Sequence, residues 1–141
     1  MKYEIPVRIT VAEPVAGVTM RVQRGKDELL PPSEQSAEAV SFDFAVTVDV
    51  TVEGLNFLGK YAQGPKNQRF IYVNSGTYAG EHSIWGRRAK ISLRSVTEEQ
   101  VREVIDSKEA RLEAAIYGKS RDGGPMCASV PVLGGWKVVK K

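Results

Sequence analysis

Arginine and aromatic residues gather in the central part of the 141-residue chain, and their chemistry is that of anion recognition. A guanidinium group binds a carboxylate, phosphate or sulfate through two parallel hydrogen bonds, and an aromatic face stacks on a sugar, a base or the guanidinium itself. We therefore expect a ligand-binding site here, the alternative being solvated arginines with Trp85 in the core or at a strand end. The candidate ligand-binding residues are Arg69, Tyr72, Tyr78, Trp85, Arg87, Arg88 and Lys90.

The charge distribution marks the same central stretch. The net charge is only +3, yet residues 60–94 hold seven lysines and arginines against Glu81 alone, whereas residues 1–59 hold five basic and nine acidic side chains. This imbalance favours a small anionic ligand or an acidic protein surface as the partner. The alternative is a solvated basic strand face that pairs with the acidic amino-terminal third.

Catalytic and metal chemistry has few residues to draw on. His82 is the only histidine and Cys127 the only cysteine, which excludes an intrachain disulfide and every multi-cysteine or histidine-rich metal centre. No acid is placed to orient His82, and no carboxylates are paired for acid–base work. Cys127 follows Met126 in an apolar run, so we expect a buried structural thiol. We expect no catalytic residue, no metal and no cofactor; enzyme activity stays open, with a non-enzymatic role favoured.

Alternation of apolar and polar residues predicts mostly β structure. The segments with strand character are residues 3–11, 18–22, 42–52, 69–73, 88–94 and 112–116, followed by strand-like pieces at 126–132 and 136–139. Pro6 cannot donate a hydrogen bond to a neighbouring strand, so we expect the first strand at a sheet edge or with a bulge. In residues 88–94 the alternation puts Arg88, Lys90 and Arg94 on one face.

The rest of the chain predicts one helix and one long loop. Thr97 has the character of an N-cap, Gln100 completes a capping box, and an apolar stripe follows, which together predict a short helix near residues 97–108. Residues 25–39 lack strand or helix periodicity, and we expect a flexible surface loop. The predicted fold is mainly β (β-rich α+β): an antiparallel β-sandwich or open barrel of about seven strands in a single domain over residues 1–141.

The amino terminus carries a charge every few positions and lacks the apolar centre of a secretory signal. The chain also has no run of about 18 apolar residues. We expect a soluble, cytoplasmic protein with no membrane partner.

Six ordered blocks of residues resemble one known family. The blocks are Phe57-Leu58-Gly59, Gln63-Gly64-Pro65, Arg69-Phe70-x-Tyr72, Gly76-x-x-Ala79-Gly80, Trp85-x-Arg87-Arg88-x-Lys90-Ile91 and Asp122-Gly123-x-Pro125-x-Cys127-Ala128. Together they are similar to the bacterial family catalogued as domain of unknown function 5990, over about Val7 to Trp136. The resemblance implies a small bacterial single-domain protein and carries no activity or catalytic residue. Gly86 departs from the pattern, since the family resemblance leads us to expect a serine there.

The leading functional hypothesis is a non-enzymatic binding module for a small anionic ligand or an acidic partner surface. The first alternative is a barrel that binds single-stranded nucleic acid, because small β-barrels combine basic grooves with stacking aromatic side chains. The second is a structural or assembly subunit, with a homodimer formed through an exposed edge strand.

Overall fold

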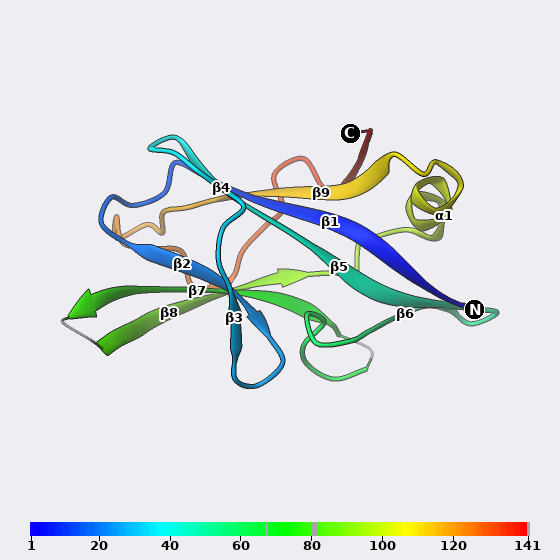
Figure 1. The fold of residues 1–141 in the computed structure, drawn as a ribbon, viewed down its shortest axis with the longest axis horizontal. Helices are drawn as coiled ribbons and strands as arrows, with labels where there is room; N and C mark the ends of the chain where they lie inside the picture. Colours follow the sequence, from blue (N-terminus) through cyan, green and yellow to red (C-terminus); the bar gives the residue numbers. More distant parts are fainter. Residues whose placement is uncertain (67, 80–81, 141) are drawn as a thin grey trace.

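The chain forms two β-sheets and a short helix in the computed structural model, which describes residues 1–66, 68–79 and 82–140, with the side chains of residues 77–85 outside that description (Figure 1). The strands are β1 Lys2–Ala12, β2 Thr19–Arg24, β3 Glu28–Leu30, β4 Glu34–Gln35, β5 Ala39–Thr51, β6 Gly54–Leu58, β7 Phe70–Ala79, β8 His82–Ser92, β9 Ala110–Tyr117, β10 Ala128–Ser129 and β11 Lys137–Lys140. The helix is α1, Glu98–Asp106. The predicted fold class, mainly β with one short helix, is confirmed. Of the described strands, seven have five or more residues, as predicted. The additional strands, β3, β4, β10 and β11, are each four residues or shorter.

The first sheet has the order β11-β9-β1-β5-β4, and β6 also pairs with β5. β1 runs antiparallel to β5 and parallel to β9, so it lies inside the sheet. The prediction of an edge strand or a bulge from Pro6 is therefore wrong, because the register with β5 also runs unbroken from Lys2 to Ala12. The ladder with β9 begins only at Val7, so β9 leaves β1 unpaired at Pro6 and the missing N–H is tolerated there.

The second sheet has the order β10-β8-β7-β2-β3. Its centre is the antiparallel pair of β7 and β8, whose register shifts between Ser75 and Gly76. At this irregularity Arg87 pairs with Ser75 and Trp85 pairs with Gly76, so Gly86 between them has no partner on β7. β10 adds to β8 in the parallel direction. The two sheets lie one over the other in Figure 1, with α1 at one end.

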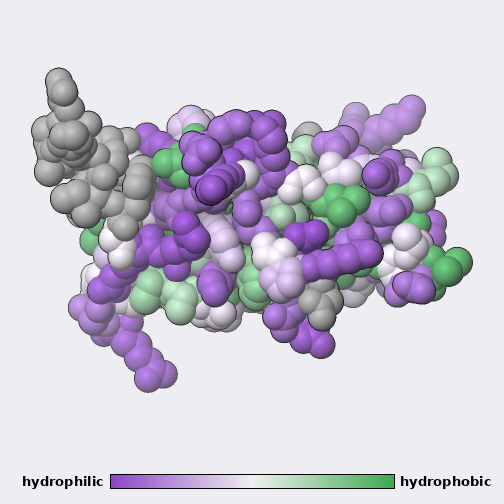
Figure 2. Space-filling model, turned by 90° about the horizontal axis from the view of Figure 1, so that it is seen from below, coloured by the Kyte–Doolittle hydropathy of each residue, from purple (hydrophilic) through white to green (hydrophobic). Residues whose placement is uncertain are grey.

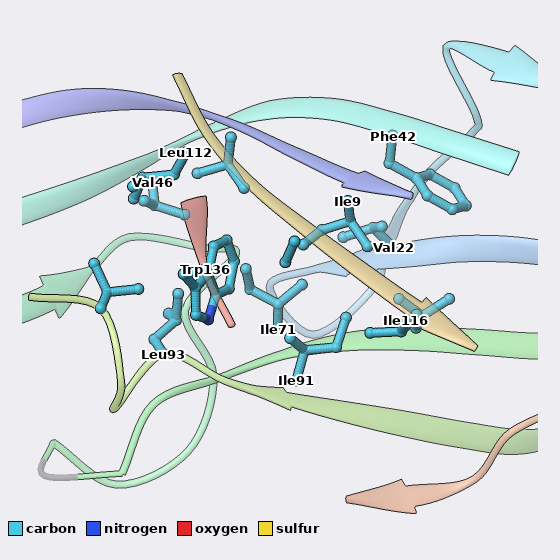
Figure 3. Packing of buried hydrophobic residues seen from close by; sticks show 14 of the residues in the cluster. Ile9, Val22, Phe42, Val46, Ile71, Ile91, Leu93, Leu112, Ile116 and Trp136 are labelled. Atoms are coloured by element: carbon cyan, nitrogen blue, oxygen red, sulfur yellow. The ribbon is translucent and has the colours of Figure 1, made fainter. Parts of the chain in front are cut away.

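Both sheets bury their inner faces in one hydrophobic core (Figure 3). Ile9 and Leu112 project from the first sheet, and Ile71 and Ile91 from the second, all essentially inaccessible to solvent. Trp136 closes the core near Leu93, and its indole N–H donates to the carbonyl oxygen of Ser92 at 2.9 Å. The alternating apolar positions predicted from the sequence supply these inner faces.

The predicted helix is confirmed together with its cap. The Thr97 side chain accepts from the backbone N–H of Gln100, and the Gln100 side chain accepts from that of Thr97. Residues 25–39 are largely exposed, but they also contain β3 and β4, so the prediction of a segment without strands is wrong. Both strands are three residues or shorter, too short to give a periodic signal.

Candidate anion-binding site

Strand geometry divides the predicted arginine cluster. Successive side chains of β8 point to opposite faces of the sheet. Ala89 and Ile91 are fully buried on the inner face, so Arg88 and Lys90 lie on the outer face, where both are exposed. Arg87 shares the direction of Ala89 and is bound by a neighbouring segment, although Arg87 and Arg88 both line the hollow described below.

Arg87 is held by the segment that precedes β10. Its Nη1 donates to the carbonyl oxygen of Pro125 at 2.8 Å and to Ser120 Oγ at 3.0 Å. Its Nη1 and Nη2 also bind the Asp122 carboxylate in a bidentate pair, at 3.1 and 2.7 Å. Arg87 is thus neutralised and serves to attach residues 120–125 to β8.

The same segment is built around this guanidinium. Gly124 packs so closely that a Cβ there would lie 3.1 Å from the guanidinium carbon of Arg87. Hydrogen bonds from Arg87, from the Ser120 hydroxyl and from the Gly124 N–H lower the pKa of Asp122 well below its ordinary value. Asp122 therefore stays charged, and Arg87 keeps its partner.

Arg88 is held without a carboxylate. Its Nε donates to Asn74 Oδ1 at 3.1 Å, and Asn74 Nδ2 donates to Gln23 Oε1 at 2.6 Å. Gln23 Nε2 in turn donates to the carbonyl oxygens of Gly25 and Lys26, both at 3.0 Å. Asn74 is 5% exposed and Gln23 8%, so the chain of hydrogen bonds is buried beneath Arg88. Among the described residues, none accepts a hydrogen bond from the two Nη atoms of Arg88, and no carboxylate lies within 4 Å of them.

Aromatic rings complete the support of the basic side chains on this face. The guanidinium carbon of Arg88 lies 4.8 Å from the ring centroid of Tyr72, and Lys90 Nζ lies 5.8 Å from that of Phe70. The two rings stack with centroids 6.4 Å apart. A cation over an aromatic face gains attraction without losing its charge. Arg88 and Lys90 therefore stay available to an external anion.

A hollow of about 540 Å³ lies beside Arg88. Its lining residues are Gln23, Lys26, Asp27, Leu29, Asn74, Gly86, Arg87 and Arg88. The hollow opens on the outer face of the second sheet. Figure 2 views the molecule from the side on which β7, β8 and β3 lie in Figure 1, and hydrophilic residues cover most of that surface. Its volume falls in the range of small-molecule sites, about 300–1,000 Å³.

The other predicted site residues do not join this group. Arg69 precedes β7, and its Nη1 donates to the carbonyl oxygen of Gly64, away from the hollow's lining residues. The side chains of Tyr78 and Trp85, and that of His82, lie outside the described residues. Of the seven predicted residues, the structure brings together Tyr72, Arg88 and Lys90 on one face.

The acidic amino-terminal third does not neutralise this face. Among the described residues, the carboxylates of residues 1–59 form ion pairs mainly with cations of their own sheet or hairpin. Lys60 is the one described cation from residues 60–94 that pairs with any of them. The pairs are Asp49 with the amino terminus, Arg8 with Glu34 and Asp43, Arg111 with Asp43, and Glu28 with Arg24 and Lys60. The alternative of a basic face paired with the acidic third is therefore wrong for Arg88 and Lys90.

Cys127 corrects another prediction. The thiol is exposed, and Met126 occupies the core in its place. Met126 and Cys127 are adjacent residues just before β10, and the core accommodates the larger apolar side chain of Met126. No three His, Cys, Asp or Glu side chains in the described part of the chain form a metal-binding group.

A family model described as "Family of unknown function (DUF5990)" matches residues 5–139, nearly the whole chain. The chain belongs to this family. No curated protein and no solved structure gives a significant match. Within residues 1–66, 68–79 and 82–140, no helix combines the length and apolar character needed to cross a membrane.

Sequence reasoning missed the residues that fix Arg88. Asn74 and Gln23 are ordinary polar residues, and nothing in their spacing shows that β2 and β7 are neighbours. One signal was present: Asn74 follows the apolar run Phe70–Val73 and continues a strand, where a buried amide needs a partner. The role of Asp122 was also missed, because its partner Arg87 lies 35 residues away in the sequence.

Proposed function

We propose that this DUF5990 protein is a non-enzymatic binding module for a small anionic ligand, with the outer face of the second sheet as its binding surface. Arg88 is the central residue, and Lys90 and Lys26 add positive charge around it. The observation that carries the proposal is the support of Arg88 by a buried amide chain and an aromatic ring in place of a carboxylate.

This support prepares Arg88 for an incoming oxyanion. One donor, Nε, is committed to Asn74, which fixes the guanidinium plane, while the Nη atoms are left for two parallel hydrogen bonds to a carboxylate, phosphate or sulfate. A side chain already ordered in the free protein loses less entropy on binding. Hydrogen bonds to charged groups are worth about 1.5–3 kcal/mol each, enough for recognition of a small ion.

Charge near the hollow supports an anion over a neutral ligand. Lys26 and Arg88 line it against Asp27 alone, because Arg87 is already paired with Asp122. Arg21 lies in the same cross-strand row as Asn74 and Arg88, and no described carboxylate lies within 4 Å of it.

The test compares thermal stabilisation by phosphate in the parent and in Arg88→Gln. A ligand at ten times its dissociation constant adds about 1.4 kcal/mol to the free energy of unfolding. The parent should show a saturable gain of this kind above the general salt effect, and Arg88→Gln should lose it. Lys108→Gln removes one exposed positive charge outside the hollow and serves as the matched control. Equal gains in parent and Arg88→Gln would remove the proposal.

Single-stranded nucleic acid is the second candidate, favoured by the stacked rings of Phe70 and Tyr72 on a basic face. Bases stack on such rings, and phosphate contacts make the affinity fall steeply with salt. A fluorescent oligothymidylate titrated at low and high salt tests it. Salt-dependent binding that Tyr72→Ala weakens supports nucleic acid, and no binding at low salt excludes it.

A further inference from the structure

A second hollow, of about 300 Å³, lies at the end of the molecule where α1 begins. Its lining residues are Gly54, Leu55, Phe57, Lys66, Arg69, Leu93, Arg94, Val96 and Glu98. It shares none of them with the hollow beside Arg88. The backbone brings its parts together, since the Leu93 N–H donates to the carbonyl oxygen of Arg69 at 3.0 Å.

The cations of this hollow are not neutralised by the carboxylate beside them. Lys66, Arg69 and Arg94 line it, and no described carboxylate lies within 4 Å of any of them. Glu98 is the acidic residue in the lining, and it pairs with Arg102 at 3.6 Å. The hollow therefore holds an excess of positive charge.

Arg69 is partly ordered there before any ligand binds. Its Nη1 donates to the carbonyl oxygen of Gly64, while its Nε is buried and finds no hydrogen-bond partner among the described residues. A buried donor without a partner is costly, and an oxyanion is one group that relieves the cost. Binding of an anion in this hollow does not depend on the N-terminal N–H groups of α1. The Thr97–Gln100 capping box already satisfies part of the first turn.

The floor of this hollow is apolar. Phe57, Leu93 and Val96 are buried there, and Leu55 is half-buried beside them. An apolar floor gives a purely inorganic ion nothing to contact, whereas it stabilises a hydrocarbon group by about 25 cal/mol per Å² buried.

We propose that this second hollow binds a small organic carboxylate whose apolar body lies on Phe57, Leu93 and Val96 and whose carboxylate contacts Lys66, Arg69 and Arg94. The site is separate from the one proposed around Arg88 and does not depend on it. Its size, at the low end of known ligand sites, fits an acid with one ring or a short chain.

Phenylacetate is the probe, and methyl resonances of Leu55 and Val96 report where it binds. These resonances should shift saturably with phenylacetate. They should not shift with inorganic phosphate, which lacks the apolar body, or with 2-phenylethanol, which lacks the charge. Shifts caused equally by 2-phenylethanol would overturn the role of the cations.

Variants then separate this site from the first. Lys66→Gln/Arg94→Gln removes two exposed charges and should weaken phenylacetate binding at least tenfold, whereas Lys108→Gln/Arg121→Gln removes two exposed charges elsewhere and should change it less than twofold. Arg88→Gln should leave phenylacetate binding intact. Loss of binding in Arg88→Gln, or full binding in Lys66→Gln/Arg94→Gln, overturns the inference while leaving the proposal at Arg88 to its own test.

Discussion

The outer faces of the two sheets carry similar arginines with different partners. On the first sheet, Arg8 of β1 lies directly opposite Asp43 of β5, and two hydrogen bonds of 2.7 Å join them. On the second sheet, Arg88 of β8 lies directly opposite Asn74 of β7, with one hydrogen bond of 3.1 Å. The cross-strand geometry is the same, and the partner is a carboxylate in one case and an amide in the other.

This difference separates an arginine with a structural use from one that we propose for recognition. A carboxylate partner consumes the charge and fixes two strands to each other. An amide partner orients the guanidinium and leaves the charge available. The residue directly opposite an outward arginine on the neighbouring strand therefore decides whether the guanidinium charge is neutralised. Only the strand register shows which residue that is.

The largest expected difference is in stability. Arg8→Gln should lower the free energy of unfolding by about 1–2 kcal/mol, because Asp43 loses both charge-assisted hydrogen bonds. Arg88→Gln should lower it by less, because a single hydrogen bond to the neutral Asn74 amide is removed. Urea denaturation of both variants measures this. Equal losses would mean that the two faces do not differ.

Arg87 sharpens the comparison inside β8 itself. Arg87→Ala removes the donor that Asp122, Ser120 and Pro125 share, so the melting temperature should fall by several degrees while the phosphate-dependent gain in stability remains. Arg121→Ala, an exposed change in the same segment, is the control and should leave the melting temperature nearly unchanged. A loss of the phosphate response in Arg87→Ala would contradict the assignment of that response to Arg88.

Acid should weaken the first face selectively. Hydrogen bonds from Arg8 hold the pKa of Asp43 below its ordinary value of 3.8. The folded state therefore favours the charged carboxylate, and its contribution is complete above that value and is lost as the pH falls through the folded-state pKa. As the pH falls from about 4 towards 2, Arg8→Gln should lose less stability than the parent, while Arg88→Gln should follow the parent. Parallel curves for parent and Arg8→Gln would count against the ion pair's contribution.

The smallest effect is expected at Gly86, beside Arg88 in the first hollow. Its φ is not positive, and a Cβ there would meet no atom of the described residues within 4 Å. Gly86→Ser should therefore change stability by no more than about 1 kcal/mol, since the loss of glycine's freedom in the unfolded chain is favourable. Thermal melting checks this, and a large loss would show that the irregularity at this position requires glycine.

Much of the fold was predictable because alternation reports burial directly. Residues 3–11 and 112–116 both form strands with their apolar positions inward, and the Thr97–Gln100 pair marks the start of α1. Strand order was not predictable, because Pro6 indicated an edge and β9 joins β1 from a distance of about a hundred residues along the chain.

The candidate site was only half predictable. Alternation separates the outward Arg88 and Lys90 from the buried Ala89. Arg87 and Arg88 line one hollow, but the pairing of Arg87 with Asp122 could not be predicted because the two residues are 35 positions apart. The support of Arg88 could not be seen, because Gln23 and Asn74 are 51 residues apart and meet only through the pairing of β2 with β7.

Arginine Nε–H resonances in a phosphate titration test the central claim most directly. Arg88 should show a saturable shift, together with the side-chain amide of Asn74, while Arg8 and Arg87 stay unchanged because their carboxylate partners exclude the ion. A shift that appears first at Arg87 or Arg8, or no saturable shift at Arg88, would contradict the account.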